Sequence, residues 1–176
     1  KNEIGAIIME PQRGVPPKKG FLESIRNTAD KIGAVLIYDE VTSGFHNNFG
    51  GIHLELGIDP DIAVFSKALG NGFPISAIVG KRDVMDVVQD TFISSTMWTE
   101  RIGFAAGLAT LEKMENKNVQ GYLIRYGKKI KNGWIDISTR TQIKINITGL
   151  DSIPNFSFDH PDSVAINTFF NQEMLE

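Results

Sequence analysis

The sequence predicts an α/β fold, with a mostly parallel sheet flanked by helices, followed by part of a smaller α+β unit. Two observations carry this prediction. In the first part of the chain, apolar runs of strand length alternate with helical and loop segments. After Asn118, a helix with a basic face, two short strand-like runs and a further helix follow, an order typical of α+β units.

The first part contains four expected strands and two expected long helices. Apolar runs predict strands at residues 4–9, 34–38, 61–65 and 75–79. Residues 18–32 have apolar side chains at helical spacing, and Gly33 stands at the expected stop. Glycine and asparagine predict a loop at 44–51 and a turn at 70–74. A helix over 100–116 follows, and its small residues would allow close packing. One side of it is expected to hold Ile102, Ala105, Ala106, Ala109 and Leu111.

The last part is expected to form a separate unit. Its elements are a helix to about residue 137, strands at 143–147 and 156–158, and a helix from about 162. We place the boundary near 117, so that 1–117 belong to a large domain and 118–176 begin a small one. The first strand starts almost at once and the last helix has no cap, so we expect an internal fragment of a longer protein.

Composition argues against several classes of function. The net charge of −3 gives no electrostatic case for nucleic acid or an anionic membrane as a partner. The absence of cysteine removes disulfides, thiolate metal sites and cysteine nucleophiles, and the three histidines lack metal-ligand spacing. No apolar run approaches the roughly 20 residues of a transmembrane helix. We therefore expect a cytoplasmic protein.

Two residues at predicted strand ends have side chains that could act in catalysis. Asp39 ends the strand at 34–38, and Lys67 follows the strand at 61–65. Ligands bind outside the carboxyl ends of strands in open parallel sheets. A lysine kept neutral beside an apolar run can attack a carbonyl, and an aspartate at a neighbouring strand end can pair with a protonated ring nitrogen. By spacing alone, both residues could equally be ordinary solvated side chains.

Four segments, in this order along the chain, resemble blocks of the class III aminotransferase family. They are EP and GFL within residues 10–22, IYDEVTSGF at 37–45, PDIAVFSKALGNGFP at 60–74 and TMWTERIGFAAGLATL at 96–111. The resemblance is strong over residues 4–116 and weaker beyond. It is nearest to the glutamate-1-semialdehyde 2,1-aminomutase-like branch of the family.

This resemblance implies the large domain of a fold type I transferase that depends on pyridoxal 5'-phosphate (PLP). Lys67 would hold PLP as a Schiff base and move the substrate proton, and Asp39 would keep the pyridine nitrogen protonated. Val41, two residues beyond Asp39 on an extended backbone, would face the same side and press on the ring. Thr96, with Ser95 as a helper, would reach the partner's cofactor phosphate, so a homodimer with shared active sites is implied. The phosphate loop and a stacking aromatic would lie upstream of residue 1, and the chain alone would be inactive.

Several of these roles have structural alternatives. Val41 could be plain core, Thr96 could be a helix N-terminal hydroxyl, and Trp98 could line a substrate pocket or a dimer contact. Glu40 is expected to be structural. Thr42 stands where many family members have Gln or Met, so this position lacks the Gln that can bond the ring oxygen.

The overall reaction has alternatives too. The shared step moves an amino group from an amine or amino acid. If the accepting carbonyl is in a second molecule the protein is a transaminase, and if it is in the same molecule an aminomutase. Val15 stands where several glutamate-using transaminases have glutamate, which weakens the case for a transaminase of that kind. A non-catalytic scaffold is the third alternative, and the intact Asp39 and Lys67 argue against it.

Overall fold

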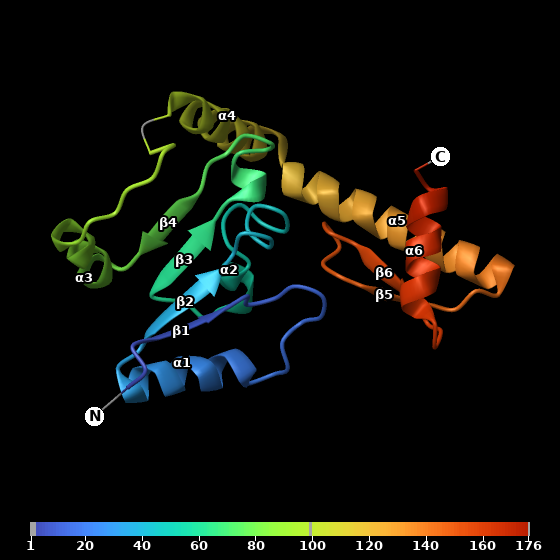
Figure 1. Cartoon of the computed structure of the whole chain (residues 1–176), viewed down its shortest axis with the longest axis horizontal. Helices are drawn as coiled ribbons and strands as arrows, with labels where there is room; N and C mark the ends of the chain where they lie inside the picture. The colour runs from blue at the N-terminus through green and yellow to red at the C-terminus, as the bar shows by residue number, and fades with distance from the viewer. Residues whose placement is uncertain (1–2, 99, 176) are drawn as a thin grey trace.

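A computed structural model of the chain describes residues 3–98 and 100–175, and it shows the expected α/β architecture (Figure 1). One sheet has the strand order β1-β2-β3-β4. Its strands are β1 (Ala6–Met9), β2 (Val35–Asp39), β3 (Ile62–Phe65) and β4 (Ala77–Gly80). β1, β2 and β3 run parallel and β4 is antiparallel to β3, so the prediction of a mostly parallel sheet is confirmed.

Helix α1 (Phe21–Ile32) covers part of this sheet. Leu22 and Ala29 of α1 form one buried cluster with Leu36 and Tyr38, which alternate with half-buried residues along β2. The helix ends at Gly33, whose φ of 71° is a left-handed conformation that glycine adopts without strain. Burial of this apolar face fixes the register of β2, whose last residue is Asp39.

Helix α4 (Arg101–Lys117) packs through glycines, as its small residues predict. A Cβ on Gly103 would stand 2.7 Å from the carbonyl oxygen of Pro74, so only glycine allows this approach. The buried residues of α4 are Gly103, Gly107 and Met114. The predicted apolar side is therefore wrong in large part: Ile102 is 58% exposed, because the helix turns its glycines towards the turn after β3.

The last part of the chain consists of α5 (Val119–Thr141), β5 (Ile145–Thr148), β6 (Asn155–Phe158) and α6 (Ser163–Glu173). β5 and β6 form an antiparallel pair, and α5 leads from α4 away from the four-stranded sheet (Figure 1). Phe156 is in ring contact with Trp134 of α5, Phe158 of β6 and Phe170 of α6, which ties these elements together. Asn118, at a φ of 46°, separates α4 from α5, and the domain boundary near 117 stays a prediction.

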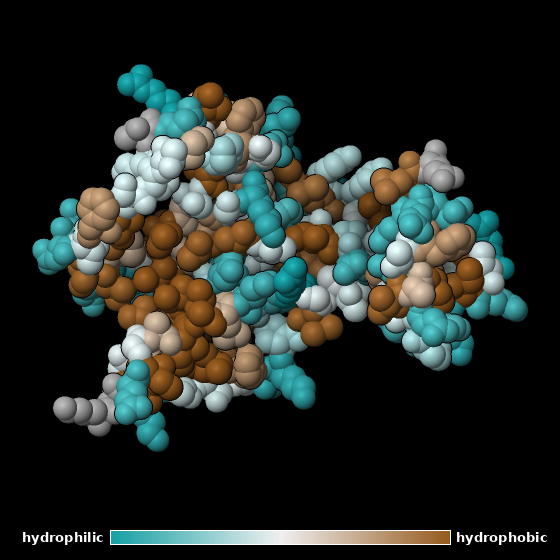
Figure 2. Space-filling view, in the orientation of Figure 1, coloured by the Kyte–Doolittle hydropathy of each residue, from teal (hydrophilic) through white to brown (hydrophobic). Residues whose placement is uncertain are grey.

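Short helices fill the remaining connections: α2 (His53–Leu56), α3 (Arg82–Met85) and the 3-10 turns Lys67–Leu69 and Asp86–Asp90. Apolar surface is extensive over the four-stranded sheet, and it includes Ile8, Ile78 and Val79, each at least half exposed (Figure 2). Within residues 3–98 and 100–175, no helix combines the length and the apolar character needed to cross a membrane.

Candidate functional site

Asp39 and Lys67 lie at the same edge of the sheet, as the two strand-end positions predict. Asp39 is the last residue of β2 and is paired in register with Val64 of β3. Lys67 is three residues beyond Val64 and two residues after β3 ends. Because neighbouring strands in a sheet are about 5 Å apart, the two carboxyl ends bring the acid and the amine into one region.

Lys67 has an unusual backbone conformation for a side chain of its size. Its φ is 42°, in the left-handed region that non-glycine residues rarely adopt, and it opens the 3-10 turn Lys67–Leu69. Its side chain is exposed, and Nζ donates a hydrogen bond to Oγ1 of Thr42 at 2.8 Å. A residue held in a sparsely populated conformation at a strand end is a marker of a functional position.

Asp39 is half-buried and has acceptor capacity to spare. Oδ1 accepts one hydrogen bond, from the backbone N–H of Val41 at 3.0 Å, and no other bond to this carboxylate occurs within residues 3–98 and 100–175. The backbone leaves the extended conformation here, since β2 ends at Asp39 and a turn begins at Val41. The extended geometry expected for Val41 is therefore wrong, and its contact with a ring stays a prediction.

Glu40, expected to be structural, is the centre of a buried network. Its carboxylate is 0% exposed and accepts bonds from the Ser43 hydroxyl, Ile52 N (3.0 Å), His53 N (3.0 Å) and His53 Nδ1 (2.8 Å). Burial acts to raise the pKa of Glu40, but the hydrogen bonds from His53 and Ser43 outweigh it and hold the pKa below its usual value. The network fixes the loop that follows β2, and with it Thr42. The sequence spacing of Glu40 and His53 does not predict the hydrogen bonds between them.

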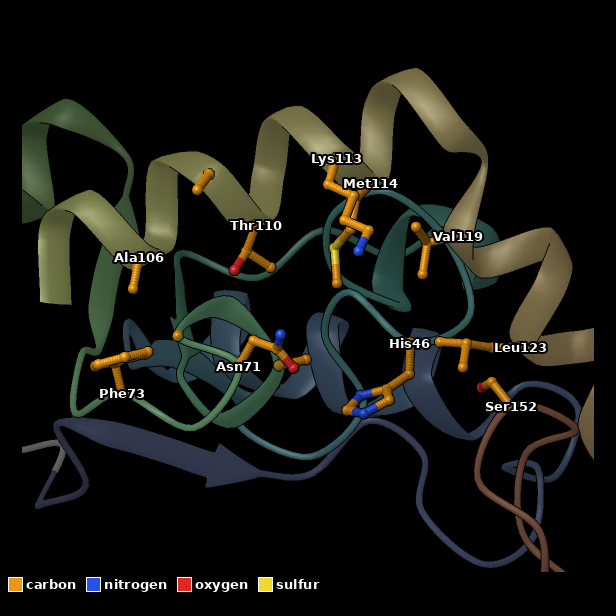
Figure 3. A pocket seen from close by; sticks show the side chains of 13 residues that line it. His46, Asn71, Phe73, Ala106, Thr110, Lys113, Met114, Val119, Leu123 and Ser152 are labelled. Carbon is orange, nitrogen blue, oxygen red and sulfur yellow. The ribbon is translucent and has the colours of Figure 1, made fainter.

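A hollow of about 620 Å³ lies beside the turn that carries Lys67. It extends from Ala68 and Asn71 to α4 and to Ser152. Figure 3 shows Thr110 and Met114 of α4 facing Asn71 and His46 across it. Burial lowers the pKa of His46, the nearby charge of Lys67 acts in the same direction, and the contact of Nδ1 with the Gly44 carbonyl oxygen (3.2 Å) opposes both. His46 is therefore a neutral, polar wall of this hollow at pH 7.

A second hollow, of about 590 Å³, brings Ser95 and Trp98 towards Ser66, the residue before Lys67. The Ser95 hydroxyl accepts the N–H of Met97 at 3.3 Å. Thr96 is exposed and makes no hydrogen bond to Asp39 or Lys67 in the described part of the chain. Its role at a partner's cofactor phosphate stays a prediction.

The helix-terminal alternative for Thr96 is excluded, because Glu100 caps α4 by accepting from Ile102 N at 2.8 Å and Gly103 N at 3.2 Å. Thr99, which belongs to the same sequence block, lies outside the described residues.

The residues at the sheet edge fit the ring and the aldehyde end of PLP. The Asp39 carboxylate keeps a free oxygen that can accept a hydrogen bond from a protonated ring nitrogen. The amine of Lys67 is exposed and held at the adjacent strand end by a hydroxyl. A reachable lysine amine and a carboxylate that can accept from the ring nitrogen are a pair of protein groups that PLP enzymes use.

A sequence model of the aminotransferase class-III family matches residues 1–172. The chain belongs to this family. The 3-aminobutyryl-CoA aminotransferase of Cloacimonas acidaminovorans is 32% identical over 166 residues, which are 90% of this chain and 40% of that protein. The glutamate-1-semialdehyde 2,1-aminomutase of Ignicoccus hospitalis is 38% identical over 122 residues, 65% of this chain and 29% of that protein.

Solved structures agree with the fold. The PLP internal aldimine form of the FumI protein of Sphingopyxis sp. MTA144 is 27% identical and superposes with a TM-score of 0.85 over 93% of this chain and 41% of that one. An omega-transaminase of Sphaerobacter thermophilus is 26% identical, with a TM-score of 0.79 over 89% of this chain and 38% of that one. The chain spans 29 to 41% of the length of these four proteins. The fold type I prediction is confirmed by the likeness of the folds.

Proposed function

We propose that the protein is a PLP-dependent aminotransferase of class III, which moves an amino group between an amine or amino acid and a carbonyl. One observation carries the proposal: Asp39 ends β2 and Lys67 lies two residues after the neighbouring parallel strand β3, with a free carboxylate oxygen on the first and an exposed amine on the second. Membership of the class III family and likeness to the PLP-containing FumI protein and to an omega-transaminase support it.

Each residue has one task in this proposal. PLP, when bound, supplies an electron sink for the bonding pair released at the substrate carbon. Lys67 Nζ would hold the cofactor when no substrate is bound. Once this amine is free, it would take the proton from the substrate carbon and later give it back. Asp39 accepts a hydrogen bond from the ring nitrogen and so holds that nitrogen protonated.

An intramolecular aminomutase is the second candidate, because several relatives carry that name. The glutamate-1-semialdehyde 2,1-aminomutases of Ignicoccus hospitalis and Nitratidesulfovibrio vulgaris are each 38% identical over the segments they share with this chain. Both candidates use the same two residues, and they differ only in where the carbonyl that receives the amine is located.

We also propose a cytoplasmic homodimer with shared active sites. The segment before α4 supports a second copy as partner, since Phe92 is 94% exposed and Ile93, Met97 and Trp98 are at least half exposed. Contiguous apolar surface of this kind marks interaction sites. Thr96 lies within this segment, where it would meet the partner's cofactor phosphate. Light scattering on the full-length protein tests the dimer, and a monomeric mass contradicts it.

The reaction is tested by supplying the full-length, PLP-loaded protein with amines one at a time, with and without a carbonyl acceptor. A transaminase releases one carbonyl product per site from the amine alone and turns over only when an acceptor is added. An aminomutase converts a single substrate to its isomer with no second substrate. Absence of both outcomes across amines, amino acids and amino aldehydes contradicts the proposal, and a Lys67→Ala variant controls for uncatalysed transfer.

A further inference from the structure

We propose that Thr42 is a positioning residue that holds the amine of Lys67 in its working orientation. The inference rests on the proposed function of Lys67 and adds a residue to it. Thr42 is 25 positions from Lys67 in sequence, yet its Oγ1 is 2.8 Å from Nζ. No other hydrogen bond or ion pair to this amine occurs in the described parts of the chain.

Both ends of this contact are fixed by the backbone. On the Thr42 side, Gly44 N donates to Glu40 O at 2.8 Å and Val41 N donates to Asp39 Oδ1 at 3.0 Å, so the turn closes directly on the end of β2. The buried carboxylate of Glu40 anchors the loop further along.

On the lysine side, the N–H groups of Gly70 and Asn71 both bond to Lys67 O, at 3.1 and 3.0 Å. The hydroxyl therefore meets a lysine whose main chain cannot shift, and only the side chain remains to be ordered. A free lysine stem has rotamer entropy to lose when it is ordered, so one hydrogen bond at its tip selects among its orientations.

A hydroxyl suits this task better than a carboxylate. It accepts a hydrogen bond from the ammonium form of Lys67 and can accept from or donate to the neutral amine, so the contact persists in both protonation states. A carboxylate at the same place would favour the charged form, which cannot act as a nucleophile or base. Thr42 thus directs the amine towards the edge where Asp39 lies without holding a proton on it.

The test follows the covalent attachment of PLP to the full-length apo protein, in which the Lys67 amine condenses with the cofactor aldehyde and one water leaves. Samples are reduced with borohydride at timed intervals, digested, and the modified lysine is quantified by mass spectrometry. The variants are Thr42→Val and Thr42→Ala, which lack the hydroxyl, and Thr42→Ser, which keeps it. Thr139→Val is the matched control, because its hydroxyl donates only to Ile135 O within its own helix, on an exposed face.

Loss of one such hydrogen bond should slow attachment at Lys67 about three- to tenfold in Thr42→Val and Thr42→Ala. Thr42→Ser and Thr139→Val should attach PLP at the wild-type rate, and unfolding midpoints should be unchanged. If Thr42→Val fails to fold, Thr42→Ala makes the same test. Wild-type rates in both hydroxyl-free variants overturn the inference, as does a Thr42→Ser variant as slow as they are. Modification of a different lysine in the wild type overturns the proposed function as well.

Discussion

Replacing the buried carboxylate of Glu40 by an amide should loosen the loop that follows β2. Gln at position 40 can keep its oxygen towards His53, where it still accepts from the backbone N–H and the ring nitrogen. Its amino group then faces the Ser43 hydroxyl, which can turn to accept, and the N–H of Ile52, which cannot. Glu40→Gln therefore leaves one buried donor, Ile52 N, without an acceptor.

An unsatisfied buried donor costs about 2 kcal/mol. Native-state hydrogen exchange measures this locally: a loss of about 2 kcal/mol speeds exchange of a peptide containing Ile52 and His53 roughly 30-fold. Glu55→Gln is the matched control, since Glu55 is exposed, accepts from Asn47 Nδ2 at 2.7 Å, and should change exchange less than about twofold. An increase below about threefold in Glu40→Gln would refute the reasoning.

Replacing Asp61, and replacing either of two glycines, provides two further predictions. The pKa of Asp61 is lowered to about 2 although burial acts to raise it, because Lys81, Leu36 N and Arg26 donate hydrogen bonds to the carboxylate. Asp61 therefore stabilises the fold by about 2 kcal/mol above pH 4, and this stabilisation is lost as pH falls towards 2. Asp61→Asn should make the unfolding midpoint depend less on pH over that range. Gly103→Ala should lower the free energy of unfolding by about 1–3 kcal/mol through overpacking, whereas Gly133→Ala, with open space at Cβ, should raise it by up to about 1 kcal/mol, both measured by urea denaturation. An Asp61→Asn profile identical to wild type, or equal effects at the two glycines, would contradict these assignments.

The sheet could be predicted because its strands are short apolar runs with glycine or proline between them. The strand, helix and strand at the start of the chain predict one parallel pair, and the expectation of a mostly parallel sheet then places the strand ends that carry Asp39 and Lys67 at one edge. The family resemblance added the chemistry of the two side chains. The long helices could be predicted because their apolar spacing extends over several turns.

Other features depend on contacts that local sequence does not encode. α2 and α3 have four residues each, which is too short for a periodic signal. The buried side of α4 was missed because glycines, which carry no hydrophobic signal, make its contact. The bond from Lys67 to Thr42 joins positions 25 apart through a turn whose shape depends on the buried Glu40.

The proposed function depends on Lys67 as the lysine that holds the cofactor. The most direct measurement mixes the full-length protein with PLP, reduces it with borohydride, digests it, and locates the modified lysine by mass spectrometry. We expect one modified lysine per chain, at Lys67, and none in Lys67→Ala. A folded protein that carries no label, or carries it on another lysine, would contradict the assignment and favour a non-catalytic scaffold.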